Sequence, residues 1–250
     1  MERTARLLSL VATALGVAAI SLNAVDETLP PLKTILDRYV EASGGRQALE
    51  SLKSLTLKGE VSSPMFGAAK WQLMAKAPNK RVMITTMEGM GDMKEGFDGK
   101  VAWSSSPFTG VVVKEGAEAE KAAREADFYR DLHMEKAYPG LHLVGTDKVG
   151  DEPVWVAEAK PVAGTIERFF FSQKSGHIIQ HESAPADGSE GGRTVARFSD
   201  FRTVGKQVVP HQIDLQITTP DGNSFTIQIK ITEVKHNVPL DDSLFAKPAA

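Results

Sequence analysis

Methionine is the residue type in this 250-residue chain whose spacing first suggests chemistry. Met87, Met90 and Met93 recur at every third position, and thioether sulfur is a soft ligand that selects Cu(I). The simpler interpretation is a flexible Met- and Gly-rich connector between two strands. A third interpretation notes that six of the eight methionines lie between Met65 and Met93, since methionine suits adaptable apolar surfaces. On that basis we predict that the three residues form a lid or flap over an apolar cleft.

The histidines and acidic residues give little sign of catalysis. His177 and His181 are the closest histidine pair, but Ile178-Ile179 between them predicts a strand, which would spread them about 13 Å apart. We therefore interpret them as surface residues. Acidic pairs such as Asp241-Asp242 lack a spacing suited to acid–base chemistry, and the GxSxG, HExxH, P-loop and GxGxxG motifs are absent. We predict no catalytic residue, no metal, no cofactor and no enzyme activity.

Composition excludes several further classes of function. The chain has no cysteine, which rules out disulfides, thiol catalysis, iron–sulfur clusters and the acylated cysteine that tethers a bacterial lipoprotein. It has 29 Lys and Arg against 32 Asp and Glu, without a long basic run. This balance argues against a nucleic-acid partner.

The first 24 residues have the features of a secretory signal. Arg3 and Arg6 precede an apolar stretch of 16 residues from Leu7 to Leu22, and Leu22-Asn23-Ala24 offers a cleavage site. A membrane-spanning helix needs about 20 residues, so we favour cleavage over an uncleaved anchor. We predict export to the periplasm, with residues 25–250 forming one domain.

The mature chain begins with helical spacing and continues mostly with alternation. We predict a helix from Leu32 to Ser43, a short one from Arg46 to Leu52 and a third over residues 115–132. The third helix has a face of alanines with Tyr129, and its charged residues are interpreted as a solvated face. Its predicted buried residues are Ala119, Ala122, Ala123, Ala126 and Tyr129, and the charged ones are Glu118, Lys121, Arg124, Glu125 and Asp131.

Alternation with a period of two starts at Leu55 and predicts short strands. Asp98-Gly99 is a strong hairpin signal, and Pro220 to Asn223 separate two long alternating runs. After Gly140 we expect strands at 141–148, 153–160, 165–172, 177–183, 194–202, 207–218 and 224–235.

The elements predict an α+β fold: one strongly curved antiparallel sheet of ten or eleven strands, an incomplete β-barrel with helices covering its concave face. A flat sheet of this width would expose its apolar face, since the helices are too few to cover it. Either the sheet closes, or its concave face holds an apolar ligand.

The candidate ligand contacts are large apolar residues of the predicted strands. Alternation does not tell which of them face inward. The consecutive phenylalanines face opposite sides of a strand, so they are either buried on both sides or line a cavity on one. The candidates are Trp71, Leu73, Met74, Met83, Phe97, Trp103, Phe169, Phe170 and Phe171.

Several short segments, in order along the chain, resemble a known family. Phe97-Asp-Gly-Lys-Val-Ala-Trp103 followed by Pro107-Phe108, Lys76-Ala-Pro-Asn79 and Leu244-Phe-Ala-Lys-Pro248 resemble segments of the LolA-type periplasmic lipoprotein carriers. The segments Tyr39 to Gly45 and Phe198 to Pro210 resemble the broader outer-membrane lipoprotein-sorting-like group. The resemblance implies a half-barrel whose cavity takes acyl chains of lipoproteins or other lipids and releases them to an acceptor, without covalent chemistry.

The resemblance also implies partners and leaves alternatives open. A lipid or acyl chain would be the ligand, with lipoprotein cargo and a membrane donor and acceptor as further partners, and the protein would be a monomer. Ala77 stands where the well-studied carriers have an arginine that latches the helical lid, so a general lipid binder fits better than a lipoprotein chaperone. The alternatives are a periplasmic sensor or interaction module of the same fold, and a Met-rich copper-binding protein.

Overall fold

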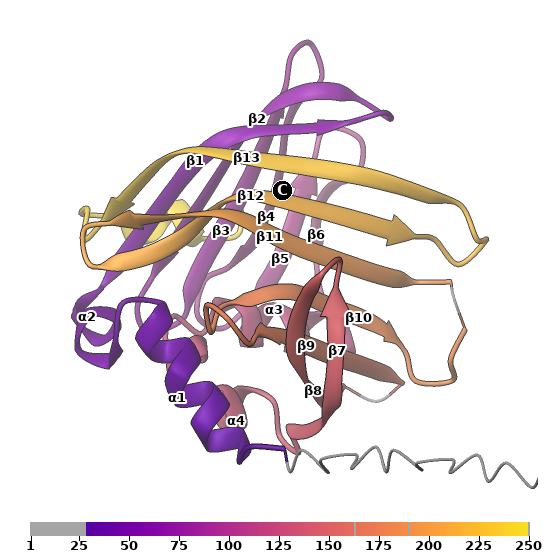
Figure 1. Ribbon diagram of the computed structural model, residues 1–250. Helices are drawn as coiled ribbons and strands as arrows, with labels where there is room; N and C mark the ends of the chain where they lie inside the picture. The colour runs from indigo at the N-terminus through magenta and orange to yellow at the C-terminus, as the bar shows by residue number, and fades with distance from the viewer. Residues whose placement is uncertain (1–28, 163, 190, 250) are drawn as a thin grey trace, which may run out of the picture.

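A computed structural model of the protein describes residues 29–162, 164–189 and 191–249, so the predicted signal at residues 1–24 lies outside the described residues. The described chain forms one antiparallel sheet of 13 strands with a few helices (Figure 1). Within these residues, no helix has both the length and the apolar character needed to cross a membrane. The strands are β1 Ser54–Ser63, β2 Gly67–Lys76, β3 Lys80–Met87, β4 Gly91–Phe97, β5 Ala102–Ser106, β6 Gly110–Val113, β7 His142–Val149, β8 Glu152–Val162, β9 Thr165–Ser172, β10 Ile178–Pro185, β11 Arg193–Val204, β12 Gln207–Thr218 and β13 Ser224–His236.

The sheet consists of two meanders joined where the first and last strands pair. Its order is β6-β5-β4-β3-β2-β1-β13-β12-β11-β10-β9-β8-β7, so β6 and β7 are the two edges. The chain between these edges contains α3 Gly116–Ala126, the 3-10 turn η1 Arg130–Leu132 and α4 Met134–Ala137. Because this connection links opposite edges of a curved sheet, it has to cross the open side. The predicted fold class is confirmed, and the sheet is not closed into a barrel.

The count of ten or eleven strands was too low. The sequence signal for a strand is weakest in two of the strands. Strand β4 reads Gly-Asp-Met-Lys-Glu-Gly-Phe, and β6 has only four residues. Neither shows a clear alternation. Pairing with β3 and β5 fixes β4, and pairing with β5 fixes β6. Long-range hydrogen bonding therefore overrides weak local preference here.

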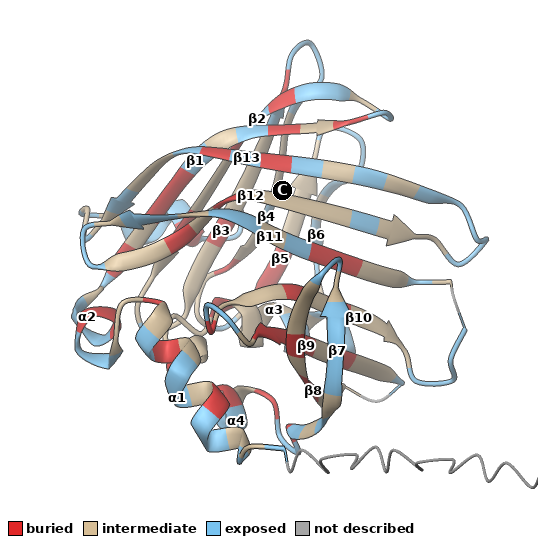
Figure 2. Cartoon of the chain, in the orientation of Figure 1, coloured by how far each residue is buried: buried red, intermediate tan, exposed pale blue. Residues whose placement is uncertain are grey.

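The N-terminal helices and the two main hairpins are confirmed. They are α1 Leu32–Ala42 and α2 Arg46–Ser51. Tyr39 of α1 meets Phe171 of β9 edge-to-face at 5.8 Å, which anchors the helix on the concave face. In the β4–β5 turn the Asp98 carboxylate accepts the N–H groups of Lys100 and Val101. Buried residues recur at intervals along the strands and on the sheet-facing side of α1 (Figure 2).

The predicted helix over residues 115–132 is shorter than expected. Helix α3 ends at Ala126, because the Asp127 side chain accepts the Tyr129 N–H and the Phe128 N–H donates to the carbonyl of Pro78. These bonds give the backbone an alternative to continuing the helix. The alanine part of the predicted face is confirmed, because Ala126 is buried with Phe97 and the other three alanines pack beside it. Tyr129, predicted on the same face, lies beyond the end of α3 and packs against the Val40 cluster instead. The break turns the following residues toward the sheet.

Candidate functional site

A cavity of about 620 Å³ lies between the concave face of the sheet and the helices. Its size is within the range of roughly 300–1,000 Å³ found for small-molecule sites. Apolar side chains from β1, β2, β12 and β13 form one wall, and α2, α4 and the segment around η1 supply apolar residues from the other side. The wall residues of these strands include Leu55, Leu57, Trp71, Leu73, Ile213, Leu215, Ile229 and Ile231.

Four of the nine predicted contact residues line this cavity: Trp71, Leu73, Met83 and Phe169. Two others share the concave face but are covered by helices. Phe97 lies beneath α3, and Phe171 is fully buried beneath α1. These two residues help to seat the helices that enclose the cavity.

Met74, Trp103 and Phe170 lie on the opposite face of the sheet, so the expectation that they contact a ligand is corrected. Met74 and Trp103 pack with Phe245 of the 3-10 turn η2 Asp242–Phe245, and Phe170 packs with Val154 and Val156. Adjacent side chains on a strand point to opposite faces of the sheet. Each of these three residues is next in sequence to a residue that faces inward, so its own side chain points outward.

The three spaced methionines belong to the β3–β4 hairpin and do not line the cavity. Met87 is buried and Met93 packs against the same apolar cluster as Trp71. Met90 is at the turn, where its N–H donates to the carbonyl of Met87, and is 43% exposed. Gly89 and Gly91, both with positive φ, close the turn between the strands. The structure thus places these residues in a tight hairpin rather than in a flap over the cavity.

A cluster of charged residues interrupts the apolar wall where the helices cross the sheet. Glu167 of β9 lies on the same strand face as Phe169 and is 4% exposed. Arg124 Nη2 donates to Glu167 Oε1 over 2.8 Å, and His181 Nε2 lies 3.0 Å from Glu167 Oε2. Burial opposes the Glu167 charge, but His181 and Arg124 outweigh it, so the pKa of Glu167 lies below its usual value. We call Arg124, Arg130, Asp131, Glu167 and His181 the polar cluster; all five line the cavity.

The histidines were misjudged as surface residues. Both line the cavity: His181 stacks on Phe169 with ring centroids 4.6 Å apart, and His177 stacks on Phe201 at 4.4 Å. Burial lowers the pKa of His177. Arg124 and Glu125 were likewise assigned to a solvated helix face, yet both line the cavity, where Arg124 pairs with Glu167 and Glu125 with Arg81. One sequence signal for the polar cluster was available. Glu167 lies on the same strand face as Phe169 and Phe171, and a carboxylate on a buried strand face requires a hydrogen-bonding or charged partner.

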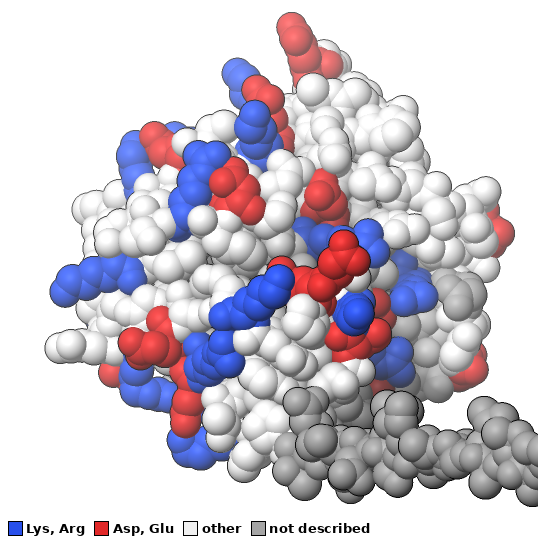
Figure 3. Space-filling view, viewed as in Figure 1, with Lys and Arg blue, Asp and Glu red and all other residues white. Residues whose placement is uncertain are grey.

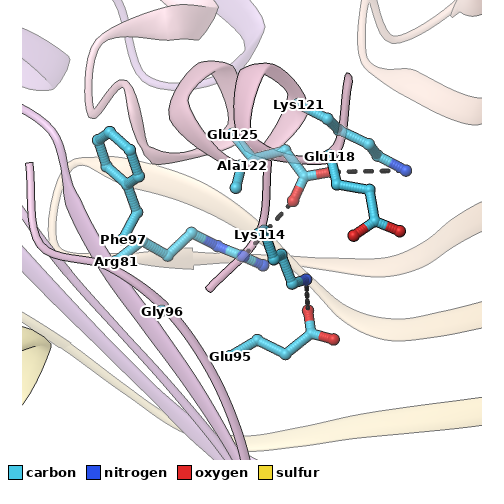
Figure 4. A pocket seen from close by; sticks show the side chains of 9 residues that line it. All are labelled: Arg81, Glu95, Gly96, Phe97, Lys114, Glu118, Lys121, Ala122 and Glu125. Carbon is cyan, nitrogen blue, oxygen red and sulfur yellow. Dashed lines mark hydrogen bonds and ion pairs between the residues drawn. The ribbon is translucent and has the colours of Figure 1, made fainter. Parts of the chain in front are cut away.

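A second, smaller pocket of about 300 Å³ lies between α3 and β3–β4 (Figure 4). Arg81 of β3 reaches Glu125 of α3 over 3.5 Å, and Lys114 reaches Glu95 over 3.3 Å. Arg81 and Glu125 line both the small pocket and the large cavity. Together with Arg124 and Glu167, this pair ties α3 to strands on both sides of the cavity.

The remaining charge is distributed without a dominant sign. On the face drawn in Figure 3, basic and acidic side chains are interspersed. Among the described residues, no group of three or more histidine, aspartate or glutamate side chains is arranged to hold a metal ion.

Comparison with known proteins identifies the fold. No protein-family model matches the chain, and no curated protein matches its sequence. Among solved structures, a LolA superfamily protein from Nitrosomonas europaea aligns with 88% of this chain and 99% of its own length, at 14% identity and a TM-score of 0.57. This chain has the LolA fold.

Two further solved structures share this fold. A domain described as an outer membrane lipoprotein-sorting protein from Vibrio parahaemolyticus matches at 12% identity and a TM-score of 0.57, covering 85% of this chain and 97% of its own. A DUF1329 family protein from Desulfovibrio piger matches at 12% identity and a TM-score of 0.54, covering 87% and 98%. The expected resemblance to LolA-type proteins is thereby confirmed at the level of the fold.

Proposed function

We propose that this protein binds an acyl chain of a lipid or lipidated protein in its cavity and carries it without covalent chemistry. The observation that carries the proposal is the apolar cavity of about 620 Å³, whose walls come from Trp71, Leu73, Met83 and Phe169 among others. An apolar ligand that enters such a cavity removes its own surface and that of the wall from water, which favours binding.

The energetics are favourable for such a ligand. Burying one methylene contributes about 0.8 kcal/mol, so ten methylenes contribute about 8 kcal/mol before the cost of ordering the chain. A net binding free energy of about 8 kcal/mol corresponds to micromolar affinity. Because ordering the chain reduces the gross value, micromolar and reversible binding requires burial of more than ten methylenes.

The proposal includes a compartment and a mode of action. The signal-like residues 1–24 support export to the periplasm, and residues 25–250 would act there as one lipid-binding domain. Without a cysteine for acylation, the chain would act as a monomeric shuttle between a membrane donor and an acceptor.

The test begins with the full chain, expressed with its own N-terminal segment and purified from periplasm without detergent. Native mass spectrometry and organic extraction should reveal a bound acyl species, and titration with a fluorescent fatty acid should saturate. Leu215→Trp, which fills the cavity, should weaken probe binding about tenfold or more, whereas Gln216→Trp on the exposed opposite face should not. A protein without co-purifying lipid or saturable probe binding would contradict the proposal.

A further inference from the structure

In the polar cluster, the terminal N–H groups of Arg130 make no hydrogen bond to the described protein. Arg130 begins η1 directly after the break that ends α3, and its side chain lines the cavity with 30% of its surface accessible. Burial alone would lower the pKa of Arg130, but Asp131 and other neighbouring groups outweigh it and hold the pKa above its usual value, so the guanidinium is charged. Because Arg130 both lines the cavity and is partly accessible, a ligand in the cavity can contact its side chain.

The hydrogen bonding of Arg130 is incomplete. Its Nε lies 3.3 Å from Asp131 Oδ1, and within the described residues its two terminal nitrogens make no hydrogen bond. A guanidinium presents these nitrogens as a planar fork that matches a carboxylate or phosphate. The fork therefore lacks an acceptor of this kind.

A second donor in the same cluster is also unpaired. Arg124 is 10% exposed, and its Nε is buried without a hydrogen-bond partner although its Nη2 holds Glu167. Its guanidinium lies 5.3 Å from the ring centroid of Tyr138. Both cationic side chains thus line the cavity, but Arg124 Nε is buried, so the accessible unpaired donors are those of Arg130.

The acidic residues that face this region are already engaged. Glu167 is held by Arg124 and His181, and Glu125 by Arg81 and Lys121. Asp127 accepts the Tyr129 N–H, and Asp131 accepts Nε of Arg130. Tyr39 stays neutral, because burial and the adjacent Asp131 raise its pKa well above its usual value. These pairings leave the Arg130 fork available to an incoming anion.

We propose that the cavity selects ligands that join an apolar chain to an anionic oxygen headgroup, a carboxylate or a phosphate, with the headgroup on Arg130 beside Arg124 and the chain along the apolar wall. This inference rests on the proposed function and specifies its ligand class.

The experiment measures displacement of the neutral probe diphenylhexatriene from the full chain. Hexadecanoic acid and hexadecyl phosphate should displace it at concentrations about tenfold lower than hexadecanol, and inorganic phosphate alone should not displace it or compete with hexadecanoic acid. In Arg130→Met the preference for the anions should fall to about twofold or less, with hexadecanol binding unchanged. Arg130→Lys, which keeps the charge but loses the fork, should give an intermediate preference.

Arg46→Met is the matched control, because Arg46 is an exposed cation on α2 outside the cavity lining. It should retain the full preference, and the unfolding midpoint of each variant reports whether it folds. Equal displacement by acid and alcohol in the wild-type protein would overturn the headgroup site while leaving the carrier intact. An unchanged preference in a folded Arg130→Met protein, or binding of inorganic phosphate without a chain, would also overturn it. Failure of the probe and all chains to bind would instead overturn the proposed function.

Discussion

Arg124 of α3 and Glu167 of β9 are 43 residues apart in sequence and form an ion pair with 2.8 Å between Nη2 and Oε1. Their side chains are 10% and 4% exposed, so the pair is buried. It joins the connection between the two sheet edges to a strand of the second meander. Arg81 and Glu125 make the matching tie to the first meander, over 3.5 Å. Two ion pairs on adjacent residues of α3 therefore tie this connection to strands of both meanders.

Removing one partner of the buried pair should be strongly destabilising. Arg124→Met leaves the Glu167 carboxylate with His181 alone in a buried site, and we expect a loss of about 3 kcal/mol in the free energy of unfolding, measured with urea. Lys33→Met removes an exposed helical pair with Asp37 and should change stability by less than about 0.5 kcal/mol. Adding Glu167→Gln to Arg124→Met should restore part of the loss, since no unpaired charge remains. Additive losses in the double variant would argue against a direct coupling.

The depressed pKa of Glu167 predicts a pH dependence of stability. Because the folded-state pKa lies below its usual 4.5, the ionised carboxylate stabilises the fold above that pH, and this contribution is lost as the pH falls through the lower folded-state value. Urea unfolding of the wild type should therefore show a steeper decline below about pH 4.5 than Glu167→Gln, which should be less stable at pH 7. The other carboxylates are present in both the wild type and Glu167→Gln, so their effects cancel when the two pH profiles of unfolding free energy are subtracted. Parallel profiles would mean that Glu167 does not carry the effect.

The C-terminal turn η2 should be a major source of stability on the face opposite the cavity. Phe245 is fully buried, its carbonyl accepts the Trp103 Nε1–H over 2.9 Å, and Lys76 and Lys80 each lie 2.7 Å from the Asp242 carboxylate. Phe245→Ala should cost about 3–5 kcal/mol in thermal or urea unfolding. Leu244→Ala, at a residue 43% exposed, is the control and should cost far less. Equal costs for the two substitutions would show that the turn does not pack as described.

Gly96 should not tolerate a side chain. A Cβ at this position would lie 2.4 Å from the ring of Trp103, its partner across the β4–β5 ladder. Since Trp103 is buried and hydrogen-bonded to Phe245, the ring cannot move away freely. Gly96→Ala should therefore lower the free energy of unfolding by about 1–3 kcal/mol, measured with urea. An unchanged unfolding midpoint would contradict this close approach.

The sequence by itself determined the fold class and most of the elements. Alternation, turn residues and helical spacing are local properties, so α1, α2 and the long β12–β13 hairpin followed from them. The strands also carry more apolar residues than the helices can cover, so either the sheet had to close or its concave face had to hold a ligand. Glu167, on the same strand face as Phe169 and Phe171, could have been recognised as a buried carboxylate.

Only the tertiary structure decided which of these residues form the site. Alternation defines two faces of a strand without telling which is concave, so Leu73 and Met74 were equivalent until the curvature of the sheet put Leu73 in the cavity and Met74 under Phe245. The polar cluster was hidden for the same reason. Its pairs join residues from α3, η1, β9 and β10, which approach one another only because the chain between the sheet edges crosses the concave side, and that contact is set by long-range strand pairing rather than by any local pattern.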